Sequence, residues 1–177
     1  MAWQQLTAFG DGSTLPWQLR ASIKRLDHNI LALDYELLAP ASELIWPAAT
    51  TPPERRDELW QSTCLELFIA KPNEPRYWEI NLSPSGDWNV YQLDGYRQGL
   101  QAEASIQRIR VSSQSAADQH QLQATVELPA ALSQAASLEA NLCAVLEHAN
   151  GSNSYWALCH PGSEADFHAR AGFVLEV

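Results

Sequence analysis

The chain has 177 residues, with 11 basic and 21 acidic side chains and a formal net charge of −10 at pH 7. This length predicts one domain, residues 1–177. The negative charge argues against nucleic acid and anionic membrane surfaces as partners, because both repel an acidic protein. Hydrophobic residues make up 46% of the chain, as in an ordinary globular protein. No apolar run approaches the roughly 20 residues that span a bilayer, so no membrane association is expected.

Short β-like runs separated by Pro, Gly, Asn and Ser occupy most of the chain. They predict about ten strands. The expected strands are residues 17–25, 29–38, 63–70, 76–83, 88–93, 106–112, 121–128, 141–148, 155–160 and 172–177. No long amphipathic helix separates them, which favours an all-β, antiparallel β-sandwich over a parallel βαβ plan. Residues 130–140 are rich in helix formers and follow Pro129, so we expect at most a short helix there.

Residues 39–61 do not have the sequence pattern of a β-strand. They contain four prolines and a charged cluster at residues 54–58. Proline cannot donate to a strand ladder, so we expect a long loop that wraps one end of the sheets. Loops of this length are often functional.

The N-terminal residues and the cysteines predict the compartment. Met1 to Gln5 contain no basic stretch followed by an apolar run, so we expect no cleaved export signal. Cys64, Cys143 and Cys159 are odd in number and form no CxxC pair, which argues against a disulfide framework and a zinc ribbon. Together these features predict a cytoplasmic protein with reduced thiols.

Alternation in the third and fourth expected strands places acidic side chains on one face. In the third strand, aliphatic residues occupy every second position, so Glu66 points away from the core. In the fourth strand, the same alternation turns Tyr77, Glu79 and Asn81 away from the core. Two carboxylates are therefore expected on one surface.

The short segment 71–75 between these strands predicts a hairpin. Burying both apolar sets on one face leaves two registers. One pairs Glu66 with Glu79; the other pairs Glu66 with Asn81 and leaves Glu79 diagonal to it. In either register, carboxylates this close need a cation, an arginine, a shared proton or a hydrogen-bonding ligand.

Two interpretations of this face remain open. It is either a solvated surface neutralised by Arg76 or Arg97, or a ligand face where polar groups bind hydroxyls and aromatic rings pack on an apolar surface. Trp88 and Tyr91 in the next strand point in opposite directions, so one of them can join the ligand face. Trp60 lies just before the third strand and could close over its end.

Four sequence blocks carry a family resemblance. They are LWQSTCLELF at 59–68, YWEINLSPSGDW at 77–88, YWALCHP at 155–161 and DFH at 166–168, with Tyr96 and Arg97 in addition. These blocks resemble the DOMON-like superfamily, most closely its bacterial branch related to family-nine carbohydrate-binding modules. The resemblance extends from Trp17 to the C-terminus and implies an immunoglobulin-like or jelly-roll-like β-sandwich with a ligand-binding face.

The resemblance implies two ligand classes, sugars and haem. Haem-binding relatives use a Met and a His as axial ligands, and because the only methionine here is Met1, haem is disfavoured. Sugar-binding relatives place a sugar against aromatic rings and bind its hydroxyls with polar side chains, in some cases with structural calcium elsewhere. We expect no cofactor, with structural calcium as the alternative. The residues at matching motif positions are Trp60, Glu66, Glu79, Asn81 and Trp88.

Several potential metal ligands gather toward the C-terminus. They are His148, Cys159, His160, Asp166 and His168. Their spacing does not predict a zinc site, which needs three or four convergent ligands. We expect Asp166 and His168 to bond backbone groups in the final turn and Phe167 to lie in the core. The alternative is that His160 or His168 contributes to ligand binding.

We therefore predict a non-enzymatic β-sandwich that binds a small molecule, with saccharides as the leading class. The candidate ligand-binding residues are Trp60, Glu66, Tyr77, Glu79, Asn81, Trp88, Tyr91, Arg97, His160 and His168. No catalytic or metal-binding residue is predicted. One alternative is a module that docks a protein partner or a second copy of the chain on this face or on residues 39–61. The other is a hydrolase that uses Glu66 and Glu79 as its carboxylate pair.

Overall fold

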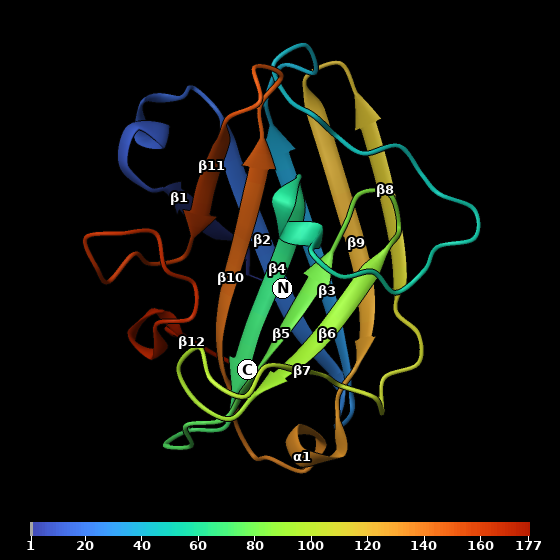
Figure 1. Cartoon of the computed structure of the whole chain (residues 1–177), viewed down its shortest axis with the longest axis vertical. Coiled ribbons are helices and arrows are strands. Elements are labelled where there is room, and N and C mark those ends of the chain that lie inside the picture. Colours follow the sequence, from blue (N-terminus) through green and yellow to red (C-terminus); the bar gives the residue numbers. More distant parts are fainter. Residues whose placement is uncertain (1) are drawn as a thin grey trace.

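The computed structural model describes residues 2–177, which fold into twelve strands with very little helix (Figure 1). The strands are β1 (Gln4–Ala8), β2 (Gln18–Asp27), β3 (Ile30–Leu38), β4 (Cys64–Ala70), β5 (Tyr77–Leu82), β6 (Trp88–Leu93), β7 (Gln101–Ala102), β8 (Arg110–Ala116), β9 (Gln119–Glu127), β10 (Glu139–Glu147), β11 (Asn153–Ala157) and β12 (Leu175–Glu176). The helices are α1 (Ala130–Ser133) and the 3-10 turns η1 (Gly10–Thr14), η2 (Leu59–Gln61) and η3 (Arg170–Gly172). The prediction of an all-β chain with at most a short helix is confirmed.

All strand pairs are antiparallel, and they follow one hydrogen-bonded path. Its order is β7-β6-β5-β4-β10-β11-β1-β2-β3-β9-β8, with β12 beside β10. The sheet curls, so that β4, β5 and β10 lie in front of β2 and β3 (Figure 1). Strand β1 joins the two halves, because Thr7 and Ala8 pair with β11 while Gln4, Gln5 and Leu6 pair with β2.

The main hydrophobic core lies inside the curl. Leu67 of β4 and Ile80 of β5 pack there with residues from the opposite half such as Leu33 and Leu122. These are the positions that strand alternation assigned to the core, because successive side chains of a strand point to opposite faces. The predicted facing of β4 and β5 is therefore confirmed.

A second apolar cluster covers the outer face of β4, β5, β6, β10 and β11. It includes Phe68, Tyr77, Tyr91, Phe167 and Phe173. Every residue of β4 and of β5 is buried, so both faces of these strands are covered. The cover comes in part from the chain after β11, which brings Phe167 and Phe173 onto this face. We call this segment, residues 158–174, the C-terminal cover.

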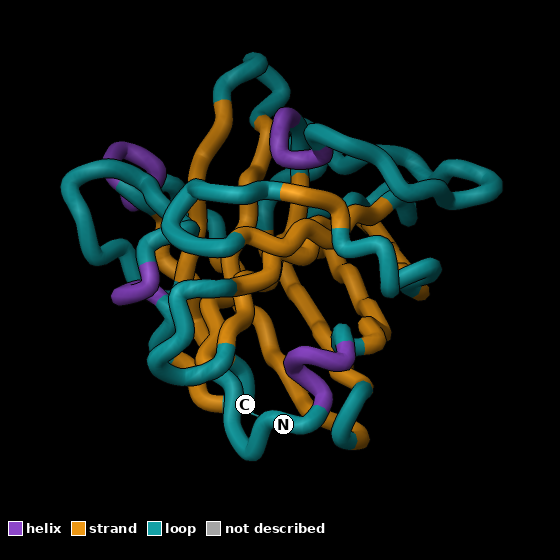
Figure 2. Tube along the Cα trace, turned by 60° about the horizontal axis from the view of Figure 1, so that its bottom comes forward, coloured by secondary structure: helices purple, strands orange, loops and turns teal. Residues whose placement is uncertain are grey.

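The segment 39–58, cyan in Figure 1, runs across the ends of several strands without forming a strand of its own. Figure 2 shows the loops of the chain in teal around the strands. Backbone hydrogen bonds attach it in turn to the β8–β9 turn through Ala41, to the end of β10 through Ile45, and to the β5–β6 turn through Thr50. The prediction of a long loop around one end of the sheet is confirmed.

Several strands differ from the sequence prediction. The strand expected at 155–160 is β11 at Asn153–Ala157, and the strand expected at 172–177 is reduced to β12 at Leu175–Glu176 after the turn η3. Strands β1 and β7 were not expected, because β1 buries only Leu6 fully and β7 has two exposed residues. The strand expected at 106–112 begins only at Arg110. Ile106 and Ile109 precede it and are buried in the main core from a loop, which explains their misleading apolar pattern. Within residues 2–177, no helix has the length and apolar character needed to cross a membrane.

Candidate functional site

A pocket of about 480 Å³ opens on the outer face of β4, β5, β6, β10 and β11. Strand residues at its lining are Glu66, Phe68, Glu79, Leu93, Val145 and Tyr155. The other lining residues come from η2, from the loop after β6 and from the C-terminal cover, and are Trp60, Arg97, Leu100, Ala165, Phe167 and His168. The pocket therefore lies between the sheet and the segments that cover it.

The β4–β5 register decides how the two carboxylates sit. Glu66 pairs with Asn81, and Phe68 pairs with Glu79. Glu79 is therefore diagonal to Glu66, which is the second of the two registers that the sequence allowed. Asn81 Nδ2 donates to Glu79 Oε1 at 2.9 Å, so the amide side chain holds one oxygen of Glu79 in place.

Both carboxylates are buried, with Glu66 2% and Glu79 4% exposed. Burial raises the pKa of each, and for Glu66 the nearby charge of Glu79 raises the pKa further. The hydrogen bond from Asn81 and the charge of Arg97 oppose the rise in the pKa of Glu79. Glu66 Oε1 has no hydrogen-bond partner. The interpretation of this face as a solvated surface is therefore wrong, because the C-terminal cover shields it from water.

Two buried thiols flank Glu66. Cys143 pairs with it across β10 and β4, and Cys64 lies two residues before it on the same face. Burial is the main cause that raises the pKa of both thiols, and Glu66 adds to it. They therefore stay protonated and are poor nucleophiles.

His168 reaches the pocket from the C-terminal cover. Its Nδ1 lies 2.8 Å from the hydroxyl of Tyr77, and that hydroxyl also accepts a hydrogen bond from Arg97 N at 3.2 Å. Burial lowers the pKa of His168 to about 4, and the charge of Arg97 contributes. The imidazole is therefore neutral at pH 7. Its Nε2 lies 3.9 Å from Glu79 Oε2, which is too long for a hydrogen bond.

Arg97 is paired with a third carboxylate and not with the buried two. Its Nη2 donates to Asp166 Oδ1 at 2.9 Å, and Tyr96 donates its hydroxyl proton to Asp166 Oδ2 at 2.7 Å. Asp166 Oδ1 also accepts from His168 N at 3.2 Å, which confirms the predicted backbone hydrogen bond of Asp166. The same prediction for His168 is wrong, because its imidazole contacts the side chain of Tyr77. Arg76 forms an ion pair with Asp94 at 3.3 Å and therefore does not neutralise the two buried carboxylates.

Aromatic side chains form part of the pocket wall. Phe167 makes edge-to-face contacts with Phe68 and with Tyr155, at centroid distances of 6.1 and 6.2 Å. Trp60 contributes a further ring and packs edge-to-face on Tyr91 at 5.8 Å. Phe167 belongs to the second apolar cluster, so its predicted core position is confirmed, although it also lines the pocket.

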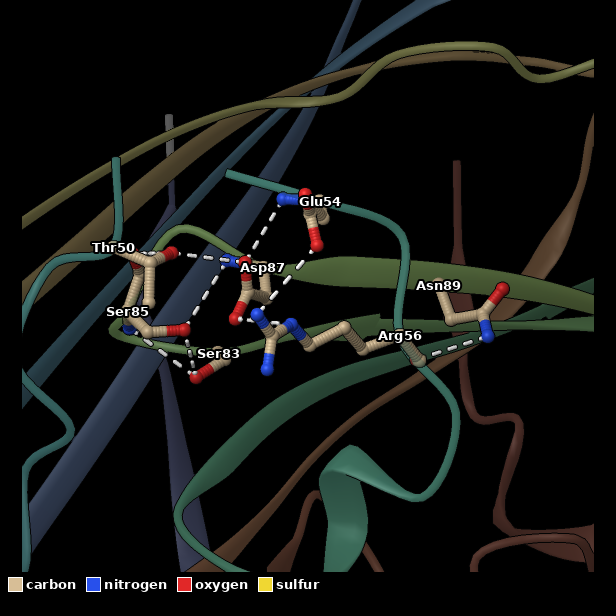
Figure 3. Close-up of polar contacts among 7 residues, drawn as sticks. All are labelled: Thr50, Glu54, Arg56, Ser83, Ser85, Asp87 and Asn89. Atoms are coloured by element: carbon tan, nitrogen blue, oxygen red, sulfur yellow. Dashed lines mark hydrogen bonds and ion pairs between the residues drawn. The ribbon is translucent and has the colours of Figure 1, made fainter. Parts of the chain in front are cut away.

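A buried carboxylate fixes the loop that leads to Trp60. Asp87 Oδ1 accepts hydrogen bonds from Thr50 Oγ1 and from Glu54 N, both at 2.9 Å, and Oδ2 forms an ion pair with Arg56 Nε at 3.2 Å (Figure 3). Asn89 Nδ2 donates to Arg56 O at 3.0 Å. The strap from Thr50 to Arg56 is thus attached to the β5–β6 turn just before η2.

Asp57, the next residue of the loop, attaches the loop to β6. Asp57 Oδ1 accepts from Asn89 Nδ2 at 2.9 Å and from the hydroxyl of Tyr91 at 2.7 Å. Three residues later, Trp60 lies on the ring of the same Tyr91. The polar contacts of Asp57 and Asp87 therefore set where Trp60 meets the pocket.

Five of the ten predicted ligand residues line the pocket, namely Trp60, Glu66, Glu79, Arg97 and His168. Tyr77, Asn81 and Tyr91 do not line the pocket but contact lining residues, which are His168, Glu79 and Trp60 respectively. Trp88 is elsewhere, in the main core, with the guanidinium of Arg55 4.5 Å from its ring centroid. His160 is also elsewhere: its Nε2 lies 2.8 Å from Thr7 O and its ring packs on Phe9.

The remaining lining residues were not predicted as ligand contacts. They are Phe68, Leu93, Leu100, Val145, Tyr155, Ala165 and Phe167. For Phe68 a signal existed, because it shares the alternation of Glu66 on β4. The others reach the pocket through pairing and folding over long sequence distances. Among the described residues, no group of three or more His, Cys, Asp and Glu is arranged to hold a metal ion.

The chain matches no known family model and no curated protein sequence. Its fold is similar to that of solved structures. One is a Bacteroides uniformis protein proposed to bind carbohydrate, with a TM-score of 0.67 and 12% identity over 98% of this chain and 84% of that chain. Another is a family-nine carbohydrate-binding module from Caldicellulosiruptor kristjanssonii in complex with glucose, with a TM-score of 0.59 and 13% identity over 99% of this chain and 82% of that chain.

A family-nine module from the same organism in complex with cellotriose has a TM-score of 0.54 and 14% identity, over 89% of this chain and 72% of that chain. At these identities, the comparisons establish a shared fold.

Proposed function

We propose that this protein is a non-enzymatic carbohydrate-binding domain and that its ligand occupies the pocket above Glu66 and Glu79. The observation that carries the proposal is the combination of two buried carboxylates with an aromatic wall in one pocket. Its volume of about 480 Å³ lies in the range of about 300–1,000 Å³ that is usual for small-ligand sites.

Each part of the pocket suits a different part of a sugar. Carboxylate and imidazole groups of Glu79 and His168 can accept from or donate to ring hydroxyls. The rings of Trp60, Phe167 and Tyr155 offer apolar surface for the C–H face of a sugar ring. The polar groups fix the orientation of the sugar, and the aromatic rings supply apolar contact area.

The structural comparisons support the proposal through the fold they share. Modules in complex with glucose and with cellotriose have this fold. The finer assignment to the DOMON-like superfamily, and the description of the curled sheet as an immunoglobulin-like or jelly-roll-like β-sandwich, belong to the same proposal. The proposed setting is the cytoplasm, which the three free cysteines support. The proposal needs no catalytic residue and no cofactor.

Calorimetric titration with a panel of mono- and oligosaccharides tests this function. We expect saturable binding of at least one sugar, and a large loss of affinity in Glu79→Ala. Glu127→Ala is the matched control, because Glu127 lies exposed on β9, in the opposite half of the sheet. The absence of binding across the panel at millimolar concentrations would overturn the proposal, and so would equal affinities of the two variants.

A further inference from the structure

The charges around the pocket do not balance. Three carboxyl groups, those of Glu66, Glu79 and Asp166, face one guanidinium, that of Arg97. Asp166 already uses the Arg97 charge through a direct hydrogen bond of 2.9 Å. His168 is neutral at pH 7, because burial lowers its pKa to about 4. The two buried carboxylates therefore have no countercharge of their own.

Such an uncompensated pair is unfavourable in a buried site. Removing a charge from water is costly unless an opposite charge or hydrogen bonds replace the water. One oxygen of Glu66 has no hydrogen-bond partner, and Glu79 Oε2 lies beyond hydrogen-bond distance of His168. A neutral sugar can supply hydroxyl protons to these oxygens but no charge. A cationic group supplies both.

The aromatic wall favours the same kind of group. Phe68, Phe167 and Tyr155 are joined by ring contacts, and Trp60 contributes a further ring to the lining. The face of an aromatic ring carries negative potential and attracts cations, most strongly in tryptophan. Carboxylates beside aromatic rings are therefore complementary to an ammonium group held on a small apolar frame.

The electrostatic field of the whole chain also favours a cationic ligand. Its formal net charge of −10 raises the local concentration of cationic ligands and lowers that of anionic ones. Anionic sugars, such as uronic acids and sugar phosphates, are disfavoured both by this field and by the carboxylates at the pocket floor.

From these observations we infer that the ligand of this pocket is an amino sugar whose ammonium group binds between Glu66 and Glu79. This inference rests on the proposed carbohydrate-binding function and adds the chemical class of the sugar. A neutral sugar of the same shape would bind more weakly, because it leaves the carboxylate pair without a countercharge.

Binding of a cation should also release a proton. The groups that face the two carboxylates are Cys64, Cys143 and Asn81 around Glu66, and Asn81, His168, Arg97, Tyr77 and Tyr91 around Glu79. Burial raises the pKa of both carboxyl groups, and the charge of Glu79 raises the pKa of Glu66 further. An ammonium group between them favours the charged carboxylates and lowers these pKa values, so a proton held on the pair passes to the buffer and the carboxylate remains with the ammonium as an ion pair.

Titration calorimetry with four probes tests the inference. The probes are glucosamine, glucose, N-acetylglucosamine and cyclohexylamine. The measurements are made at a pH of about 6.5, below the pKa of about 7.7–8.0 that is usual for an α-amino group, so that free amines are protonated. Acetylation removes the charge of glucosamine and keeps its ring, which makes N-acetylglucosamine the matched neutral ligand. Cyclohexylamine keeps a ring and the charge without hydroxyls.

We expect glucosamine to bind at least about tenfold more tightly than glucose or N-acetylglucosamine, a difference that corresponds to about one ion pair in a partly buried site. Its binding enthalpy should change between phosphate and ACES buffers, which both accept protons at this pH with different enthalpies, in proportion to the protons released. Glu79→Gln should bring the ratio of glucosamine to glucose affinity toward one, and Glu66→Gln provides the same test if the first variant folds poorly. Glu127→Gln should keep the ratio.

The outcomes separate the two proposals. Equal affinities for glucose and glucosamine would overturn the amino-sugar inference and leave the carbohydrate-binding function in place. Binding of cyclohexylamine without any sugar would support a cation site and overturn the carbohydrate-binding function. If none of the probes and no sugar of the wider panel binds, both are overturned.

Discussion

The hydroxyl of Tyr77 lies 2.8 Å from Nδ1 of His168, a residue 91 positions later in the chain. This hydrogen bond ties β5, in the middle of one half of the sheet, to the C-terminal cover. Because Tyr77 also accepts a hydrogen bond from Arg97 N, one phenol group connects three segments around the pocket.

Tyr77→Phe removes both hydrogen bonds and leaves the ring in place. We expect the free energy of unfolding to fall by about 1–2 kcal/mol, because the partly buried backbone N–H of Arg97 and Nδ1 of His168 both lose their hydrogen-bond partner. Urea denaturation measures the change. Tyr155→Phe is the control for stability, since the Tyr155 hydroxyl makes no hydrogen bond among the described residues, and it should cost less than about 0.5 kcal/mol. Equal losses in both variants would contradict this role of Tyr77.

His168 makes stability fall in acid. Its folded-state pKa of about 4 lies below the ordinary 6.5, so the unfolded chain binds more protons between these values and stability drops as the pH falls through this window. Between pH 7 and about pH 4.5, the wild type should lose roughly 2 kcal/mol more than His168→Gln. Denaturation curves of both proteins at the two pH values check this difference, and parallel losses would contradict it.

Glu66 makes the folded protein less stable as the pH rises. Its pKa is raised in the folded state, so its contribution is most favourable below the unfolded pKa of about 4.5 and is lost as the pH rises through the folded value. Glu66→Gln resembles the protonated acid. We expect it to be more stable than the wild type at pH 8, on the order of 1 kcal/mol or more, and to lose this advantage near pH 4. Glu127→Gln, at an exposed position, should show no such pH-dependent gain.

Asp87 should be critical for the strap from Thr50 to Arg56. Asp87→Ala breaks two hydrogen bonds and the ion pair with Arg56 (Figure 3). A loss of about 2–4 kcal/mol is expected, because backbone and side-chain donors lose a buried acceptor. Hydrogen exchange should accelerate at residues 54–61. In Glu54→Ala only the exposed contact with Arg56 at 3.5 Å is removed, and the loss should stay below about 1 kcal/mol. Similar exchange rates in the two variants would argue against the anchoring role.

Trp60 should report ligand binding. It lines the pocket and is half-buried, so a bound sugar changes its surroundings directly. Trp60→Phe should abolish most of the ligand-induced change in tryptophan fluorescence. It should also weaken binding about tenfold, because the smaller ring offers less aromatic surface to the ligand. Trp3→Phe removes an exposed tryptophan that stacks on Arg20 away from the pocket, and it should leave the signal intact. A signal that survives in Trp60→Phe would place the ligand elsewhere.

The sequence allowed the carboxylate face to be predicted because the relevant information is local. Glu66, Glu79 and Asn81 belong to one hairpin, and alternation within each strand fixes which way they point. Local alternation could not show that this face is buried. Its cover comes from Phe167 and His168, and nothing near β4 in sequence indicates where that segment lies.

The wrong predictions of individual site residues also arise because local alternation does not show how distant segments pack. Trp88 and Tyr91 face opposite sides of β6, and alternation alone could not tell which of them lies on the outer face, where Tyr91 contacts the lining residue Trp60. The choice follows from which side of β6 the core occupies, and Trp88 takes the core side. Tyr155 and Val145 line the pocket because β10 lies between β4 and β11, a pairing between strands that are distant in sequence.

The position of β1 has a consequence for the order in which the fold can be completed. Thr7 pairs with Ala157, so the two halves of the sheet are joined only when a residue near one end of the described chain meets a strand about 150 positions away. Such distant pairings form late, since long loops must close first. During synthesis on the ribosome, hairpins such as β2–β3 can form before β11 and the C-terminal cover have been made. A product that stops before these two segments would lack part of the pocket lining and would not bind its ligand.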